Sequence, residues 1–144
     1  MATITYTDDI VKVCSSMAED YRKAAKAIPT PAERRLMESI AGQKRDQADH
    51  LAAAFAALAG RVGTGNGSAP PLNLGLFPSI PEAIELMSLL TLVVERESAF
   101  ASLLDTLGRE KADEEARVAL LALADTSRKF ASWAQDHIDL LGLF

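Results

Sequence analysis

Apolar residues recur along this chain at intervals of three and four, with polar residues between them. From about residue 8 to 27 this spacing is that of an amphipathic helix with one apolar face. Three further segments, about 31–59, 81–107 and 113–141, carry the same helical spacing. The sequence shows no sustained alternation of β-branched residues, which is the pattern of strands. We therefore predict an all-α protein built from four helices.

Prolines and glycines mark the expected ends of these helices. Pro29 and Pro31 separate the first two helices, and Pro31 suits the first turn of the second one. Gly60 is expected to end the second helix. The third helix is expected to begin near Pro81 and to end at Gly108 or in the charged segment after it. The segment of about 60–80 is rich in glycine and proline, so we predict a loop there.

The length of this loop constrains the arrangement of the helices. About 20 extended residues reach at most roughly 70 Å, whereas a helix of about 30 residues is roughly 45 Å long. The middle connection can therefore run the whole length of a four-helix bundle, while the other two connections are short. This order of connections is typical of a bundle with one long crossover between its second and third helices.

Polar residues interrupt the apolar faces of three helices at one level of the expected bundle. We predict a central polar layer there, whose members are Tyr21, Lys44, Gln47, Glu95 and Ser98. Alternatively, these residues lie at the edges of their helices and the assigned faces are shifted by one residue.

Four segments around this level resemble the rubrerythrin-type branch of the ferritin-like superfamily. They are "CSSMAEDYRKAA", "SIAGQKRDQADHL", "VERESAFAS" and "LADTSRKFASWAQ". In that family each half of the chain supplies a helix with E-x6-Y and then a helix with E-x-x-H, and six ligands hold two iron or manganese ions. The resemblance implies a single ferritin-like four-helix domain over residues 1–144, with a crossover loop at about 60–80. It places the six ligand positions on Cys14, Lys44, Gln47, Glu95, Ser127 and Phe130.

The residues at these positions differ from the family's ligands in their chemistry. Lysine is a cation where a cation should bind, and phenylalanine cannot coordinate a metal. Serine and glutamine are weak neutral donors to a site that needs several carboxylates. By this alignment Glu95 alone keeps the family residue. We therefore predict a degenerate site with no metal, no cofactor and no catalytic residue.

A buried carboxylate without a partner would be unfavourable, and this motivates a hypothesis about Glu95. Lys44 lies at the same level on a facing helix and could supply the positive charge that two metal ions supply in the family. The alternative is that both long side chains extend to solvent.

Composition narrows the remaining possibilities. The formal net charge is -5 and no basic run is present, so we expect no nucleic-acid partner. The longest apolar run, "AIELMSLLTLVV", is too short to span a membrane, and the first residues lack the pattern of a signal peptide. We therefore expect a cytoplasmic protein without membrane contact. Cys14 is the single cysteine and lies on an apolar face, where we interpret it as a small buried residue.

Two other features of the sequence concern a possible surface metal site and a possible dimer interface. Asp46 and His50 are four residues apart on the second helix and could share a surface metal ion, although two ligands bind weakly and a solvated face is the simpler interpretation. The third helix is apolar on more than one side, and so is the tail "IDLLGLF". We predict a homodimer formed through the third helix and this tail.

The sequence thus favours a non-catalytic interaction or structural protein with a lost dimetal site. Two alternatives stay open. One is a rubrerythrin-like, metal-dependent redox protein with unconventional ligands drawn from Glu95, Cys14 and their neighbours. The other is a protein that binds a small molecule in the cavity where the metals would lie.

Overall fold

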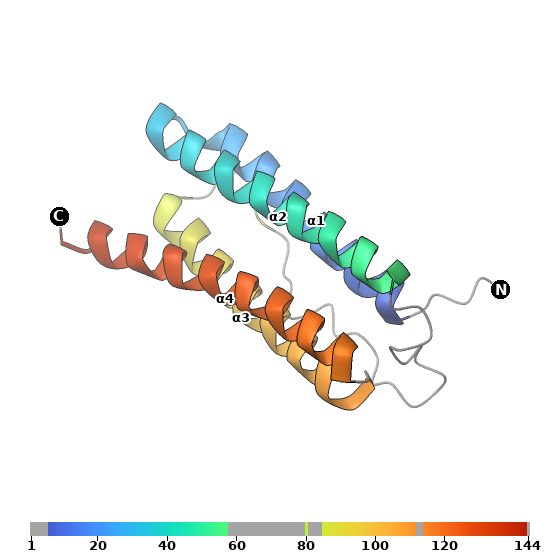
Figure 1. The fold of residues 1–144 in the computed structure, drawn as a ribbon. Coiled ribbons are helices and arrows are strands. Elements are labelled where there is room, and N and C mark those ends of the chain that lie inside the picture. The colour runs from blue at the N-terminus through green and yellow to red at the C-terminus, as the bar shows by residue number, and fades with distance from the viewer. Residues whose placement is uncertain (1–5, 58–79, 81–84, 112–113, 144) are drawn as a thin grey trace.

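The fold consists of four long helices, as the sequence predicts (Figure 1). The structure, a computed structural model, describes residues 6–57, 80, 85–111 and 114–143. Its helices are α1 (Tyr6–Ala27), α2 (Pro31–Ala57), α3 (Leu86–Lys111) and α4 (Glu114–Leu141). The prediction of an all-α, four-helix protein is therefore confirmed. The loop predicted at about 60–80 lies outside the described residues apart from Ile80, and so do its expected boundary residues Gly60 and Pro81.

The helices pack as two pairs, α1 against α2 and α3 against α4. Within each pair the helices run in opposite directions, whereas α2 and α3 run in the same direction (Figure 1). The end of α2 and the beginning of α3 consequently lie at opposite ends of the molecule. A short hairpin connection cannot join two such ends.

The short connection between α1 and α2 is held by a side chain of α2. Pro31 begins α2, as predicted from its fixed backbone angle. The Arg34 guanidinium donates hydrogen bonds from Nε to the carbonyl oxygen of Ile28 (3.0 Å) and from Nη2 to that of Pro29 (3.2 Å). These carbonyls follow the last turn of α1 and have no partner within that helix. Arg34 therefore closes the first hairpin.

The third helix is described over a range that differs from the predicted one. α3 begins at Leu86, and residues 81–84, where it was expected to begin, lie outside the described part. It ends at Lys111, within the charged segment that was one of its two expected ends. Gly108 does not end the helix but lies buried within it. A Cβ atom at this position would lie 3.5 Å from the Cβ of Leu120 on α4. This is an ordinary van der Waals distance, so the packing of α3 against α4 leaves room for an alanine at this position.

The apolar faces predicted for the helices form the core. On α1 the apolar face is buried and includes Ile10, Cys14, Met17, Tyr21 and Ala24, and Ile28 directly after the helix is buried as well. On α3 the apolar segment divides between the core and the surface. Leu89, Leu90 and Val93 are buried, Leu92 and Val94 are half-buried, and Met87 is exposed.

The exposed apolar side chains bear on the predicted homodimer, which stays a prediction. Met87 near the start of α3 is 37 % exposed, and Leu140 and Leu143 near the end of α4 are 53 % and 77 % exposed. The start of α3 and the end of α4 lie at the same end of the molecule (Figure 1). None of the described helices has the length and apolar character needed to cross a membrane.

Candidate functional site: a buried lysine–glutamate pair

A lysine and a glutamate form an ion pair in the centre of the helix bundle. Lys44 lies midway along α2, and its Nζ is 2.6 Å from Oε1 of Glu97 on α3. Both side chains have 0 % of their surface exposed. Each charge has been removed from water, so each depends on the other for compensation.

The second oxygen of Glu97 also has a partner. The Tyr21 hydroxyl on α1 donates a hydrogen bond of 2.6 Å to Oε2 of Glu97. Burial raises the pKa of the Tyr21 hydroxyl well above its ordinary value, and the nearby Glu97 carboxylate raises this pKa further. The phenol therefore keeps its proton and acts as a donor to the carboxylate.

Aromatic rings surround the lysine ammonium. The Nζ of Lys44 lies 4.1 Å from the ring centroid of Phe100 on α3 and 5.9 Å from that of Phe130 on α4. A cation over the face of an aromatic ring is attracted by the ring's quadrupole, more strongly when water is excluded. Phe130 therefore helps to accommodate a charge at a position where the resemblance expects a metal-binding histidine.

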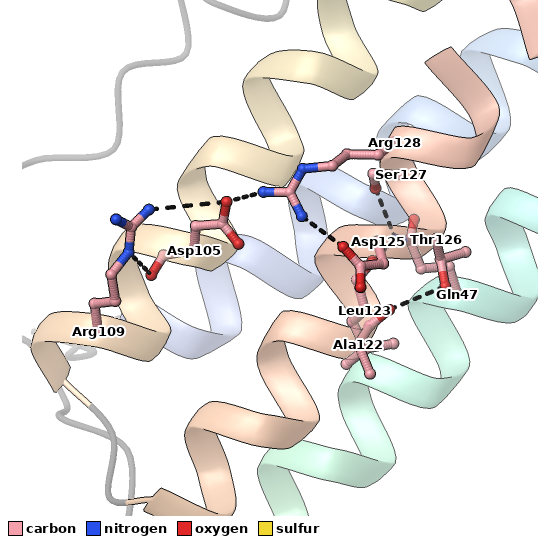
Figure 2. Close-up of polar contacts among 9 residues, drawn as sticks. All are labelled: Gln47, Asp105, Arg109, Ala122, Leu123, Asp125, Thr126, Ser127 and Arg128. Atoms are coloured by element: carbon pink, nitrogen blue, oxygen red, sulfur yellow. Dashed lines mark hydrogen bonds and ion pairs between the residues drawn. The ribbon is translucent and has the colours of Figure 1, made fainter. Parts of the chain in front are cut away.

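A second set of hydrogen bonds joins α2 to α4 beside the ion pair (Figure 2). The Nε2 of Gln47 donates to Oγ of Ser127 at 2.8 Å and to the carbonyl oxygen of Leu123 at 3.0 Å. On its other side, the thiol of Cys14 lies 3.6 Å from Oε1 of Gln47, which is the range of a weak S–H···O contact.

These contacts form a polar layer to which all four helices contribute. We define the central polar layer by its members in the structure: Cys14, Tyr21, Lys44, Gln47, Glu97 and Ser127. All six residues are at most 2 % exposed. The bonds from Tyr21 and Lys44 to Glu97, and from Gln47 to Ser127, connect the α1–α2 pair with the α3–α4 pair. The layer therefore fixes how the two helix pairs meet.

The sequence identified most of this layer but placed the wrong carboxylate in it. Tyr21, Lys44 and Gln47 are brought together, whereas Glu95 and Ser98 are exposed on the outer side of α3. The hypothesis of a Lys44–Glu95 pair is therefore wrong, because the partner of Lys44 is Glu97. The predicted inward face of α3 was shifted by two residues, which turns a helix by more than half of a full rotation.

A regularity of the sequence points to Glu97. Cys14 precedes Lys44 by 30 residues, and Glu97 precedes Ser127 by the same interval, whereas Glu95 would give 32. If Glu97 is the residue that corresponds to Cys14, the interval to the next aligned position is the same in both halves of the chain. Requiring equal spacing in both halves would have selected the correct glutamate.

Arg96 is a further buried charge that the sequence analysis missed. Its residue is 2 % exposed, and its Nη2 donates to Oδ2 of Asp20 on α1 at 2.9 Å. Its guanidinium carbon lies 5.5 Å from the centroid of the Tyr21 ring. The Nε and Nη1 atoms of Arg96 have no hydrogen-bond partner among the described residues. Arg96 gives α3 a second polar contact with α1, next to Glu97.

A third polar cluster lies between α3 and α4 (Figure 2). The Asp105 carboxylate forms ion pairs with Arg128 on α4 and, at 3.9 Å, with Arg109 one turn along α3. Arg128 also contacts Asp125 at 2.7 Å. The side chains of Arg109 and Arg128 are 67 % and 48 % exposed, so water screens the charges of both arginines, whereas the Asp105 side chain that they share is only 12 % exposed.

The donor atoms of the central polar layer do not fit a pair of metal ions. Lys44 offers an ammonium already paired with Glu97, and Phe130 offers no donor atom. Burial raises the pKa of the Cys14 thiol to about 11, with smaller and opposing effects of Lys44 and Glu97. This thiol is therefore protonated at neutral pH, whereas metals bind the thiolate. The described residues include no cluster of three or more His, Cys, Asp or Glu side chains able to hold a metal.

The other candidate metal pair lies on the surface. Asp46 and His50 are both exposed on α2, where they border a groove that faces α4. His137, the other histidine, contacts Trp133 on the same helix. Its Nδ1 lies 3.1 Å from the carbonyl oxygen of Trp133, and its ring centroid lies 4.2 Å from that of the Trp133 ring.

The raised pKa of Cys14 predicts how stability changes in alkali. The folded chain keeps the thiol proton between pH 9.0 and about 11, whereas the unfolded chain loses it near 9.0. The free energy of unfolding therefore falls as pH rises through this window, by about 2 kcal/mol from Cys14 at 1.36 kcal/mol per pKa unit. We expect Cys14→Ala to show a flatter dependence in urea denaturation measured from pH 8 to 11. The raised pKa of Tyr21 acts in the same direction and persists in this variant, because burial and Glu97 are its larger causes and Cys14 is a minor one. Equal slopes for both proteins would therefore contradict the assignment to Cys14.

Comparisons with known proteins find no matching family model, no matching curated protein and no matching solved structure. The residues of the central polar layer, and the fold that brings them together, are consequently the basis for inferring a function.

Proposed function

We propose that this chain is a ferritin-like four-helix bundle of the rubrerythrin type that has lost its dimetal site and acts as a non-catalytic interaction or structural protein. The observation that carries this proposal is the contact of 2.6 Å between Lys44 Nζ and Glu97 Oε1, with both side chains fully buried. In the family that the sequence resembles, two metal ions provide positive charge among carboxylates at this level. In this chain the Lys44 ammonium provides the positive charge, and Glu97 is the carboxylate that it compensates.

The arrangement of the helices supports the same proposal. Two antiparallel pairs, with α2 and α3 running in the same direction, are what a ferritin-like bundle with one crossover requires (Figure 1). The level of the central polar layer matches the resemblance as well. With Glu97 in place of Glu95, the aligned ligand positions of one half contact those of the other half across the bundle, as in the bonds from Lys44 to Glu97 and from Gln47 to Ser127.

The chemistry of the layer supports a protein without catalytic activity of its own. The Cys14 thiol is protonated and has no basic histidine partner in the layer, so it is a poor nucleophile. The two oxygens of Glu97 are already engaged by Lys44 and Tyr21. A buried carboxylate that is held by two donors is poorly placed to accept a proton from a substrate. A redox protein with unconventional ligands would need donor atoms that this layer does not offer.

Elemental analysis tests the loss of the metal site. We expect protein purified without added metal, and then incubated with Fe²⁺ or Mn²⁺ and desalted, to retain far less than one equivalent per chain by inductively coupled plasma mass spectrometry. The physical reason is that a metal ion would have to displace the Lys44 ammonium from Glu97. Retention of nearly two equivalents of either metal would contradict the proposal and favour the redox alternative.

A further inference from the structure

A groove between α2 and α4 is large enough for a small molecule. Its volume is about 510 Å³, within the range of roughly 300–1,000 Å³ that is usual for ligand sites. Gln47 and Phe130, at two of the six aligned ligand positions, border it from the inside. The groove thus lies on the outer side of the central polar layer, whose own members are packed against one another.

The two ends of the groove differ in character because α2 and α4 run in opposite directions. Gln47 is bonded to Leu123 and Ser127, so residues before Gln47 on α2 are level with residues after Ser127 on α4. Leu36 and Ile40 therefore share one end with Phe130 and Trp133, and this end is mainly apolar. The Trp133 ring is held in place by its contact with His137 on the same helix. A fixed aromatic ring beside aliphatic side chains is a suitable surface for a flat apolar group.

Two unused hydrogen-bond donors face this apolar end from opposite walls. Lys129 precedes Phe130 on α4 and borders the groove, and its ammonium takes part in no ion pair or hydrogen bond with the described part of the chain. Ser39 on α2 also borders the groove. Its oxygen accepts a hydrogen bond of 3.1 Å from Gln43, and its own hydroxyl proton has no acceptor among the residues described.

We propose that this groove binds a small molecule with a flat apolar body and one carboxylate. The body packs on Trp133 and Phe130, and the carboxylate accepts hydrogen bonds from Lys129 and Ser39. A positive charge favours an anion, and charge-assisted hydrogen bonds are stronger than neutral ones. Asp46 also borders the groove, seven residues along α2 from Ser39, which is about 10 Å on a helix. This inference goes beyond the loss of the metal site and does not depend on it.

The single tryptophan of the chain provides the readout, because the indole N–H of Trp133 gives one cross-peak in a ¹⁵N-correlated NMR spectrum. The probes are biphenyl carboxylate and its neutral analogue, biphenyl carboxamide. We expect both to shift the Trp133 peak, with the carboxylate binding roughly five-fold more tightly than the amide, as suits one partly exposed charge-assisted contact. Lys129→Gln should abolish this preference. Lys23→Gln, which removes an exposed lysine of α1 outside the groove, should preserve it.

Three results would overturn this inference: a Trp133 peak that neither probe shifts at millimolar concentration, equal affinity for the two probes, or an unchanged preference in Lys129→Gln. Lys129 is exposed, so its substitution leaves the core intact. Failure of this titration would leave the metal analysis unaffected, and metal retention would leave the titration unaffected, so the two proposals fail independently.

Discussion

The Lys44→Met variant is expected to lose about 3–5 kcal/mol of unfolding free energy, because it leaves the buried Glu97 carboxylate without a compensating charge. For a chain of 144 residues this corresponds to a decrease of the melting temperature on the order of 10 °C. Methionine has nearly the length of lysine and is apolar, so the loss of charge rather than of volume determines the result. Urea denaturation followed by circular dichroism measures it.

Two controls separate the ion pair from a general loss of packing. Glu95→Gln removes an exposed carboxylate two residues away and should change stability by less than about 0.5 kcal/mol. The combined variant Tyr21→Phe, Lys44→Met and Glu97→Leu removes both charges and the hydroxyl that depends on them. It should recover most of the lost stability, because apolar replacement of a buried ion pair is often neutral or stabilising. Unchanged stability in Lys44→Met alone would show that the pair is not formed in the folded protein.

Installing the ligands of the family that the sequence resembles should create a dimetal site in this bundle. The required substitutions are Cys14→Glu, Lys44→Glu, Gln47→His, Ser127→Glu and Phe130→His, with Glu97 kept as the sixth ligand. We expect this variant to bind two Co²⁺ ions per chain, because two glutamates and two E-x-x-H pairs then face one another at a single level. Cobalt absorption in the visible spectrum and the stoichiometry of titration measure the effect. The variant should be unstable without metal, since its carboxylates repel one another.

The five-substitution variant also tests whether Glu95 or Glu97 faces the centre of the bundle. Adding Glu97→Gln to the five substitutions should remove one ligand and weaken Co²⁺ binding by more than tenfold. Adding Glu95→Gln should leave Co²⁺ binding unchanged, because this side chain is exposed on the outer side of α3. The opposite outcome, in which Glu95 is required and Glu97 is not, would contradict the orientation of α3 described above. A folded five-substitution variant that binds no Co²⁺ would contradict the alignment of the two halves.

The sequence predicted the helices well because their burial pattern is periodic over many residues. The apolar face of α1 and the inward position of Lys44 and Gln47 both follow from spacing of three and four. The end of α3 was harder to predict, because a glycine after an apolar segment is typical of a helix end. α3 nevertheless continues past Gly108 to Lys111, within the charged segment that was the other expected end.

The rotation of α3 about its axis could not be predicted from hydrophobicity alone. Its first half is apolar on more than one side, so the pattern does not decide which face is inward. The segment "ERE" then offers three charged residues in a row, of which two are buried. Arg96 faces Asp20 and Glu97 faces Lys44, and these partners are 76 and 53 residues away in the sequence. Contacts of this kind follow from tertiary packing, and the equal spacing of the two halves indicates the position of Glu97 but not the contact of Arg96 with Asp20.

A double-mutant cycle between Lys44 and Glu97 tests the central claim most directly. It compares Lys44→Met, Glu97→Leu and the double substitution, all in a Tyr21→Phe background that leaves no hydroxyl without an acceptor. We predict a favourable coupling free energy of at least about 2 kcal/mol, because each single substitution isolates one buried charge and the double substitution isolates none. Single effects that simply add, with a coupling energy near zero, would contradict the claim that this ion pair holds the centre of the bundle.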